Sequence, residues 1–425
     1  MLSFRLPTTS CRRMNGQLSQ YWWASQDKVK GIHWLSWPAI CVSKFRGGLG
    51  FRDFDLFNIA MLAKQAWKLL LAPTSTLARM YKARYHPHCD FLHTTTGSRP
   101  SWAWQGVLAG RELLLKGLRW QVGCGTAIRI LEDPWLPTSP PSSPSLLPGV
   151  HLPSLYVASL IDPLTRQWNI QLLQSYFTLA SVHSILSIPI PLTPRPDRYI
   201  WHYSKTGQYS VKSGYHLLSD VRSELFNTLP PHLDARFWKW LWSLPVPPKL
   251  KFFLWRVVRG FLPCLAVLHT KNLSDSNVCS VCTDGVESIS HCLFDCRVAR
   301  AVWNLAGKDH VHVLLSGMTP DLAWYTIFFY LQLSKVAMVE LVFLAWRIWK
   351  ARCWSCYDKV QFLPGPLFRQ FLHQKEEWIA ATSPPSSHGC RLARPPISSP
   401  WPSCPPGGLV VRFDGATRRE VGGSI

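Results

Sequence analysis

The sequence predicts a mainly α-helical protein with small β elements and Pro/Ser-rich linkers, and three observations lead to this prediction. Residues 1–135 alternate aromatic-rich helical patterns with glycines, and residues 322–378 carry a second helical pattern. A compact set of cysteine and histidine residues lies between these two regions. The strand-like run in the last part of the chain is Leu409–Phe413.

The clearest predicted helix is Asn58–Leu71. Its apolar side chains recur at helical spacing and form one stripe, which is typical of a helix that packs against a core: Ile59, Leu62, Ala63, Ala66, Leu69 and Leu70. The preceding Gly47–Gly50 segment predicts a turn. It lacks the spacing and the Lys-Ser/Thr pair of a phosphate-binding loop.

Two segments rich in Pro and Ser divide the chain. Residues 136–154 are expected to form a linker or surface loop that builds no core, and residues 382–408 form a second linker. The predicted organisation is therefore 1–135, linker 136–154, a compact region 155–310, a helical segment 311–380, linker 382–408 and a short stretch 409–425. Seventeen residues after the second linker (409–425) cannot fold alone.

The charge balance favours polyanionic partners. The chain has 46 Lys and Arg against 24 Asp and Glu, a formal net charge of +22, and such a surplus favours contacts with phosphate backbones.

The most apolar stretch, Leu322–Trp349, is interrupted by Gln332, Ser334, Lys335 and Glu340, so no membrane span is expected. The scattered cysteines predict free thiols in a reducing intracellular compartment, the nucleus or cytoplasm. The acid-poor N-terminus leaves an organelle transit peptide as an alternative.

The most informative motif is C-x2-C-x8-H-x4-C, formed by Cys279, Cys282, His291 and Cys296. Two thiolates separated by two residues can bind one ion from a tight turn, and a later His and Cys complete a tetrahedral Cys3His shell. The motif therefore predicts a structural zinc ion with no coordination position left open for hydrolytic chemistry. Cys292 is the alternative ligand if this arrangement is wrong, and accidental clustering of cysteines is the competing explanation.

The segment just upstream of this motif, residues 236–260, carries basic residues and no acidic one. Basic groups beside aromatic rings are typical of proteins that bind single-stranded or hairpin nucleic acid. The competing interpretation is a pair of helices with an aromatic core and a solvated basic face. The candidate nucleic-acid-binding residues are Arg236, Lys239, Lys249, Lys251, Arg256 and Arg259.

These motifs together resemble the C-terminal part of a plant LINE-type (non-LTR) retrotransposon reverse transcriptase. The likeness to its zinc-binding domain rests on Asp197–His202, Gly207–Tyr215, Phe237–Lys239, Pro247–Lys249, Phe253–Arg256, and the ending Cys279, Cys282, Glu287, His291, Cys296 and Trp303. Upstream, the segment after the polymerase palm is matched by Trp34–Trp37, Gly47–Asp53, Asn58–Trp67, Trp120–Gly123 and Asp133–Pro137. Cys124 stands where the family commonly has an acidic residue.

Downstream, Trp346–Arg352 resembles the helix before an RNase H-like domain, and Phe413–Ala416 resembles the first strand of that domain. The resemblance thus implies a helical post-polymerase segment at 1–135, the zinc-binding domain at 155–310, a helical segment at 311–380, and an incomplete RNase H-like start at 409–425.

The resemblance also bears on catalysis. The family's palm carries a Tyr-x-Asp-Asp turn that holds two metal ions, and this motif is absent from the sequence. By resemblance Asp414 is the first RNase H carboxylate, although Asp414-Gly415 is also an ordinary turn. We therefore predict a zinc-binding, retroelement-derived fragment that binds RNA or DNA and has no polymerase or nuclease activity. The alternative is a protein-interaction module that uses the aromatic helices at 237–265 and 322–378.

Overall fold

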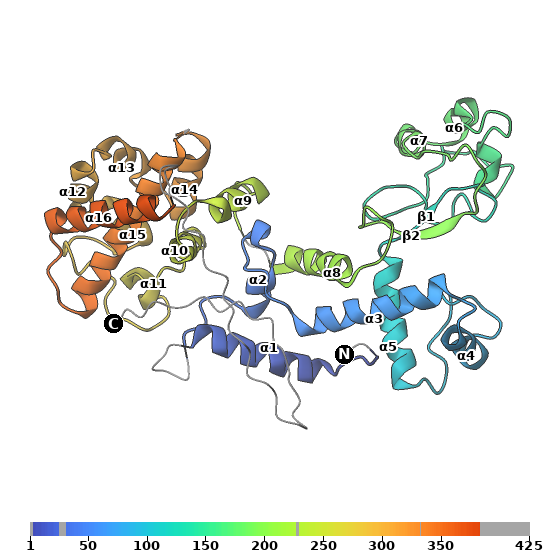
Figure 1. The fold of residues 1–425 in the computed structure, drawn as a ribbon, viewed down its shortest axis with the longest axis horizontal. Helices are drawn as coiled ribbons and strands as arrows, with labels where there is room; N and C mark the ends of the chain where they lie inside the picture. The colour runs from blue at the N-terminus through green and yellow to red at the C-terminus, as the bar shows by residue number, and fades with distance from the viewer. Residues whose placement is uncertain (1–2, 25–30, 227–228, 332, 383–425) are drawn as a thin grey trace, which may run out of the picture. The chain divides into compact units, whose positions relative to one another are not determined.

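The computed structural model describes residues 3–24, 31–226, 229–331 and 333–382 (Figure 1). Two units are distinguished, residues 1–373 and 374–425. The second predicted linker, the strand at 409–413 and Asp414 lie outside the described residues, apart from Thr382, which ends a helix.

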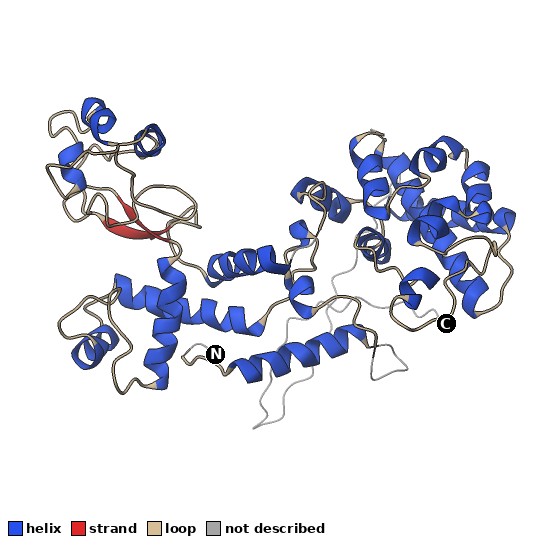
Figure 2. Ribbon diagram, turned by 180° about the vertical axis from the view of Figure 1, so that it is seen from behind, coloured by secondary structure: helices blue, strands red, loops and turns tan. Residues whose placement is uncertain are grey.

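The prediction of a mainly helical protein with small β elements is confirmed, as the colours of Figure 2 show. The elements are α1 (Thr8–Trp23), α2 (Trp37–Cys41), η1 (Lys44–Arg46), α3 (Phe54–Leu71), α4 (Thr76–Tyr85), α5 (Trp102–Leu115), β1 (Leu118–Gln121), η2 (Val157–Leu160), α6 (Ile170–Tyr176), α7 (Leu179–Leu186), β2 (Arg198–Trp201), α8 (Val211–Phe226), α9 (Ala235–Ser243), α10 (Pro248–Val258), α11 (Leu265–His269), η3 (His291–Asp295), α12 (Arg297–Leu305), α13 (Asp309–Leu315), α14 (Pro320–Phe329), α15 (Lys335–Tyr357) and α16 (Pro364–Thr382).

Helix α3 organises the first core. Asp53 caps it, because its carboxylate accepts the backbone N–H groups of Asp55 and Leu56 at 2.9 and 3.3 Å. The predicted apolar stripe is confirmed, with Leu62, Ala63, Ala66 and Leu69 buried. Helix α5 crosses α3 closely at Gly110, where a Cβ atom would lie 2.4 Å from the α3 backbone (Figure 1).

Asp53 also ties α3 to α8. Its carboxylate accepts a hydrogen bond from Arg222 of α8 at 3.0 Å, and its backbone N–H donates to the Tyr215 hydroxyl at 2.9 Å. Gly47 makes a second long-range contact, because its carbonyl accepts the indole N–H of Trp255 at 2.8 Å. The upstream motifs and the region matched to the zinc-binding domain therefore pack on one another.

The single sheet in the described ranges pairs β1 with β2 in antiparallel register, Leu118 opposite Trp201 and Gln121 opposite Arg198. The chain between these strands folds around Trp135, which is fully buried and donates its indole N–H to Ile130 O at 2.9 Å. We call this group the Trp135 cluster: Val122, Ile128, Ile130, Trp135, Leu136, Val157, Leu160, Ile161, Leu173, Phe177, Val182 and Ile185.

The Trp135 cluster corrects one expectation about residues 136–154. The segment is a loop, but it is not free of core contacts, because Leu136 is only 2% exposed and Leu146 packs against the cluster. Leu136 forms an isolated bridge with Ser142, and Leu146 forms another with Phe177. Such bridges let individual leucines of a Pro/Ser-rich segment reach an apolar core without regular secondary structure.

Aromatic rings from distant helices form the core beside the Cys/His region. Phe328 of α14 lies 6.0 Å from Phe237 and 4.8 Å from Trp240, both of α9, between ring centroids. Phe253 of α10 lies 5.3 Å from Trp346 of α15. The rings of the predicted aromatic helices therefore largely pack against one another.

Candidate metal centre

The first two cysteines of the motif lie on a tight turn. Val278 and Val286 form an antiparallel bridge, and Cys279 N–H donates to Gly285 O at 3.0 Å. The turn closes with Thr283 and Gly285, whose backbone φ angles are +57° and +74°. Both cysteine side chains point inward, because Cys279 and Cys282 are buried. We call residues 277–296 the knuckle.

The other two residues of the motif, His291 and Cys296, lie at the two ends of a π-helical turn. In an α-helix, residues five apart lie about 140° from each other around the axis, so His291 and Cys296 would face different sides. Here Cys296 N–H donates to His291 O at 2.8 Å, an i to i+5 bond that widens the turn. The π-helical turn therefore directs the side chains of His291 and Cys296, which are five residues apart, to the same candidate metal position.

The structure brings Cys279, Cys282, His291 and Cys296 together. Their ligand atoms all lie within 4.8 Å of one another, and Cys282 Sγ lies 3.3 Å from His291 Nε2. Tetrahedral zinc with Zn–S bonds near 2.3 Å places neighbouring ligand atoms about 3.8 Å apart. The Cys3His donor set and its spacing thus fit zinc after small side-chain rotations.

The four side chains of the cluster shift one another's pKa values. Contact with Cys296, followed by burial, raises the pKa of Cys279 to about 12, and the same contact lowers the pKa of Cys296. Contact with Cys279 raises the pKa of His291. Metal ligands of these types bind in their deprotonated forms, so a zinc ion held by these residues would displace the thiol protons.

The alternative ligand, Cys292, does not belong to the cluster. Its side chain is buried, and burial followed by the charge of Glu287 raises the pKa of the Cys292 thiol well above its ordinary value. Because the π turn directs His291 and Cys296 to one centre, Cys292 faces the protein core instead.

A buried ion pair joins the knuckle to α15. Glu287 is fully buried, and its Oε1 accepts hydrogen bonds from Arg352 Nε at 3.0 Å, from Arg352 Nη2, and from Leu265 N–H at 2.7 Å. Burial by itself lowers the pKa of Arg352, but the hydrogen bond and charge of Glu287 outweigh it, so the pKa of Arg352 is raised.

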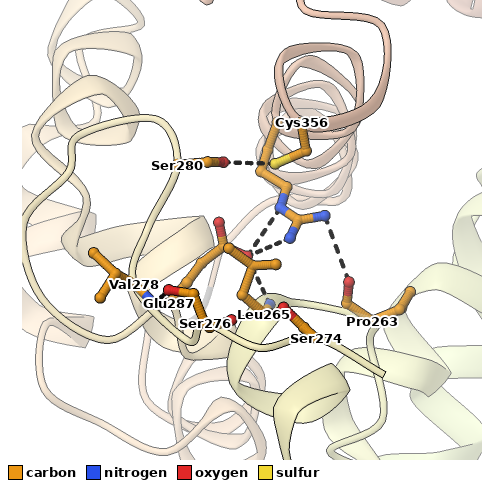
Figure 3. Close-up of polar contacts among 9 residues, drawn as sticks. Pro263, Leu265, Ser274, Ser276, Val278, Ser280, Glu287 and Cys356 are labelled. Atoms are coloured by element: carbon orange, nitrogen blue, oxygen red, sulfur yellow. Dashed lines mark hydrogen bonds and ion pairs between the residues drawn. The ribbon is translucent and has the colours of Figure 1, made fainter. Parts of the chain in front are cut away.

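Figure 3 shows Glu287 beside Leu265, and Cys356 of α15 facing Ser280. The Ser280 Oγ and Cys356 Sγ atoms lie 2.7 Å apart. Arg352 also approaches Pro263 O at 3.5 Å. The Glu287–Arg352 ion pair was not predicted from the sequence. Both residues lie in motifs that the sequence analysis names, but nothing in their spacing indicated that they meet. The Glu287–Arg352 pair thus joins two regions that the sequence analysis separated at residue 310.

Trp303, the last residue of the matched motif, covers the π turn. Its indole N–H donates to Leu293 O at 2.7 Å, and its ring stacks on Phe294 at 5.8 Å between centroids. Trp303 is fully buried. The ring therefore satisfies a backbone carbonyl of the turn and shields the turn from water.

Comparison with known proteins agrees with this geometry. Residues 209–303 match the family described as zinc-binding in reverse transcriptase. An uncharacterised mitochondrial protein of Arabidopsis thaliana is 37% identical over 145 residues, which cover 34% of this chain and 94% of that protein. A second Arabidopsis thaliana protein, named as a proposed ribonuclease H protein, is 26% identical over 455 aligned positions that cover 99% of this chain and 68% of that protein.

The chain belongs to the retroelement-derived proteins that carry a reverse transcriptase zinc-binding domain. The predictions of this family and of zinc as its cofactor are confirmed. Within the described ranges, no helix is both long enough and apolar enough to cross a membrane.

The basic residues of the reverse transcriptase zinc-binding domain have different surroundings. Arg236 pairs with Asp234 at 2.7 Å and lies 5.2 Å above the Phe329 ring. Lys251 donates to Trp242 O at 2.8 Å. Arg259 is half-buried, and burial lowers its pKa.

Lys239, Lys249 and Arg256 are exposed and form no ion pair within the described ranges. Lys249 and Arg256 are seven residues apart on α10, so they share one side of that helix with Phe252. We call Lys249, Phe252 and Arg256 the basic face of α10.

Proposed function

We propose that this retroelement-derived chain binds RNA or DNA through the basic face of α10 and Lys239, and that Cys279, Cys282, His291 and Cys296 hold a structural zinc ion that stabilises the domain. We also propose that the element of origin is of the LINE type. The observation that carries the binding proposal is the placement of Lys249 and Arg256 together on one exposed side of α10 with no carboxylate neighbour among the described residues. The net charge of +22 supports it.

The proposed zinc ion has a structural role because the four protein ligands complete a tetrahedral shell. No ligand position remains for an activated water, which hydrolytic zinc chemistry requires. The proposal therefore assigns to the ion the folding of the knuckle and not a chemical step.

Polymerase and nuclease activities are not part of the proposed function. Nucleotide addition needs paired carboxylates that hold two metal ions, and the sequence contains no Tyr-x-Asp-Asp motif. We expect no primer extension and no metal-dependent cleavage by the purified chain. Cleavage that requires Mg²⁺ and disappears in Asp414→Asn would contradict this part of the proposal.

The experiment that tests the proposal uses the full chain. Metal content is measured by elemental analysis, and binding to a labelled single strand is measured at about 50 and 200 mM salt. We expect one zinc per chain and binding that weakens steeply as salt rises. Salt-independent association with other proteins, and no association with nucleic acid, would favour the interaction-module alternative.

A charge variant sharpens the test. Lys249→Gln together with Arg256→Gln removes two phosphate contacts, so the slope of log affinity against log salt should fall by roughly 1.4 for a single strand. The matched control is Lys64→Gln with Lys68→Gln, two exposed lysines on α3. Equal slopes for the two double variants would place binding elsewhere on the chain.

A further inference from the structure

Trp242 differs in burial from two other indoles of α9 and α10. Trp238 and Trp255 are buried in the core, whereas Trp242 is only half-buried. Its indole N–H donates to Lys44 O at 3.1 Å, across 198 residues of sequence. Since Lys44 lies in the short η1 turn, this bond fixes the orientation of a partly exposed ring at the place where η1 meets α9.

Two lysines contact this residue. Lys44 Nζ lies 5.2 Å from the centroid of the Trp242 ring, and Lys251 Nζ donates to the Trp242 carbonyl at 2.8 Å. Neither ammonium group has a carboxylate partner within the described ranges. Burial and then the charge of Lys44 lower the pKa of Lys251.

The surroundings add aromatic surface and little acidic charge. Phe252 contacts Trp242 edge-on at 5.8 Å between centroids, and Phe45, next to Lys44, is 53% exposed. The Asp220 carboxylate pairs with Arg46 of η1 at 3.5 Å. A fixed, partly exposed indole, with one ammonium group over its ring and another on its own backbone carbonyl, matches a ligand that combines a flat ring with neighbouring anionic groups.

We propose that Trp242, Lys44 and Lys251 form a stacking site for one unpaired nucleotide of a bound single strand. The base lies on the indole face after Lys44 swings aside, and the ammonium groups bind the flanking phosphates. This inference rests on the proposed nucleic-acid binding and names a site within it. Phe252 connects the site to the basic face of α10, so a strand on that face continues across Trp242.

The test compares Trp242→Ala and Trp242→Phe in the full chain, with labelled 15-mers of uridylate or thymidylate. Stacking on an aromatic side chain predicts about tenfold weaker binding for Trp242→Ala and near-complete recovery in Trp242→Phe. The salt slope should be the same in both variants. The control is Trp102→Ala, which removes a 66% exposed indole from the start of α5.

Two further measurements do not depend on how well the Trp242 variants fold. An abasic 15-mer should bind the unmodified chain about tenfold more weakly than the normal strand does. Lys44→Ala, at an exposed position, should lower the salt slope by about 0.7, whereas Lys64→Ala should not. Competition by uridine monophosphate separates a site for free nucleotides from a site for a strand, since a strand site needs both flanking phosphates.

The outcomes separate the inference from the proposed function. Salt-sensitive binding that is equal for Trp242→Ala, Trp102→Ala and the abasic strand would overturn the stacking site and leave the proposed function standing. Absence of salt-sensitive binding by the unmodified chain would overturn both. Tight competition by free uridine monophosphate would show a mononucleotide site and overturn the strand site. A base-dependent loss confined to Trp242→Ala supports the inference.

Discussion

The Trp135 cluster and the knuckle are both loop-rich, yet different interactions hold them. In each region, isolated bridges replace regular sheets. The Trp135 cluster buries many large apolar side chains, whereas Val278 and Val286 of the knuckle are 46% and 52% exposed. The cysteine turn of the knuckle therefore buries little apolar surface at these two positions and depends on its ligand cluster and on the Glu287–Arg352 pair.

Each region also uses one carboxylate to organise backbone. In the Trp135 cluster, Asp197 accepts the N–H groups of Gly123, Gly125 and Ala127 at 2.7, 2.9 and 3.0 Å. In the knuckle, Glu287 accepts from Arg352 and from Leu265 N–H. The comparison teaches that short irregular segments become ordered through a few polar centres when they cannot bury enough apolar surface.

The largest effect is expected from removal of a metal ligand. Cys282→Ser or His291→Ala should lose the zinc ion and destabilise the knuckle by more than about 4 kcal/mol, because structural zinc binding is coupled to folding. Metal content and amide hydrogen exchange provide the measurement. Exchange should rise across residues 277–305, while the Trp135 cluster stays protected. Unchanged metal content in both variants would refute the assignment of the ligands.

The buried ion pair should give the next effect. Arg352→Met leaves the Glu287 carboxylate without its cation and should cost about 3–5 kcal/mol in the free energy of unfolding, measured with denaturant. The double variant Glu287→Gln/Arg352→Met should lose less, because the neutral amide oxygen still accepts Leu265 N–H. Arg300→Met, at an exposed position of α12, is the control. A double variant less stable than Arg352→Met would contradict this account.

A smaller effect is expected at Asp197. Asp197→Asn keeps one acceptor oxygen but turns an amide N–H₂ toward Ala127 N–H, so it should cost about 2 kcal/mol. Hydrogen exchange should increase at Gly123, Gly125 and Ala127 and stay unchanged in the knuckle. If exchange rose equally in both regions, the two would not be stabilised independently.

The smallest effect is expected for Cys124→Ser. The thiol lies 3.0 Å from the Thr126 hydroxyl and 3.8 Å from Asp197 Oδ2, contacts that a hydroxyl can also make. The free energy of unfolding should change by no more than about 0.5 kcal/mol. The same substitution at Cys282 should be far more damaging. A similar loss at both positions would mean that Cys124 has a role beyond its loop.

Much of the candidate metal centre could be predicted because its ligand types are rare and closely spaced. The C-x2-C-x8-H-x4-C motif named the four side chains that the structure brings together.

The roles of the basic residues could not be predicted in the same way. Whether Lys251 faces solvent or a carbonyl depends on where Trp242 lies, and that position depends on Lys44 in a distant turn.

The sequence alone determined the helical character, the apolar stripe of α3, the zinc-binding motif and the family, because each depends on local periodicity or on short spacing. Only the tertiary structure decided that Glu287 meets Arg352, that Asp197 organises Gly123–Ala127, and that leucines of a Pro/Ser-rich loop join a core. These contacts join residues 65 and 74 positions apart, or depend on isolated bridges. No local pattern encodes such pairings, because they arise when separate elements pack together.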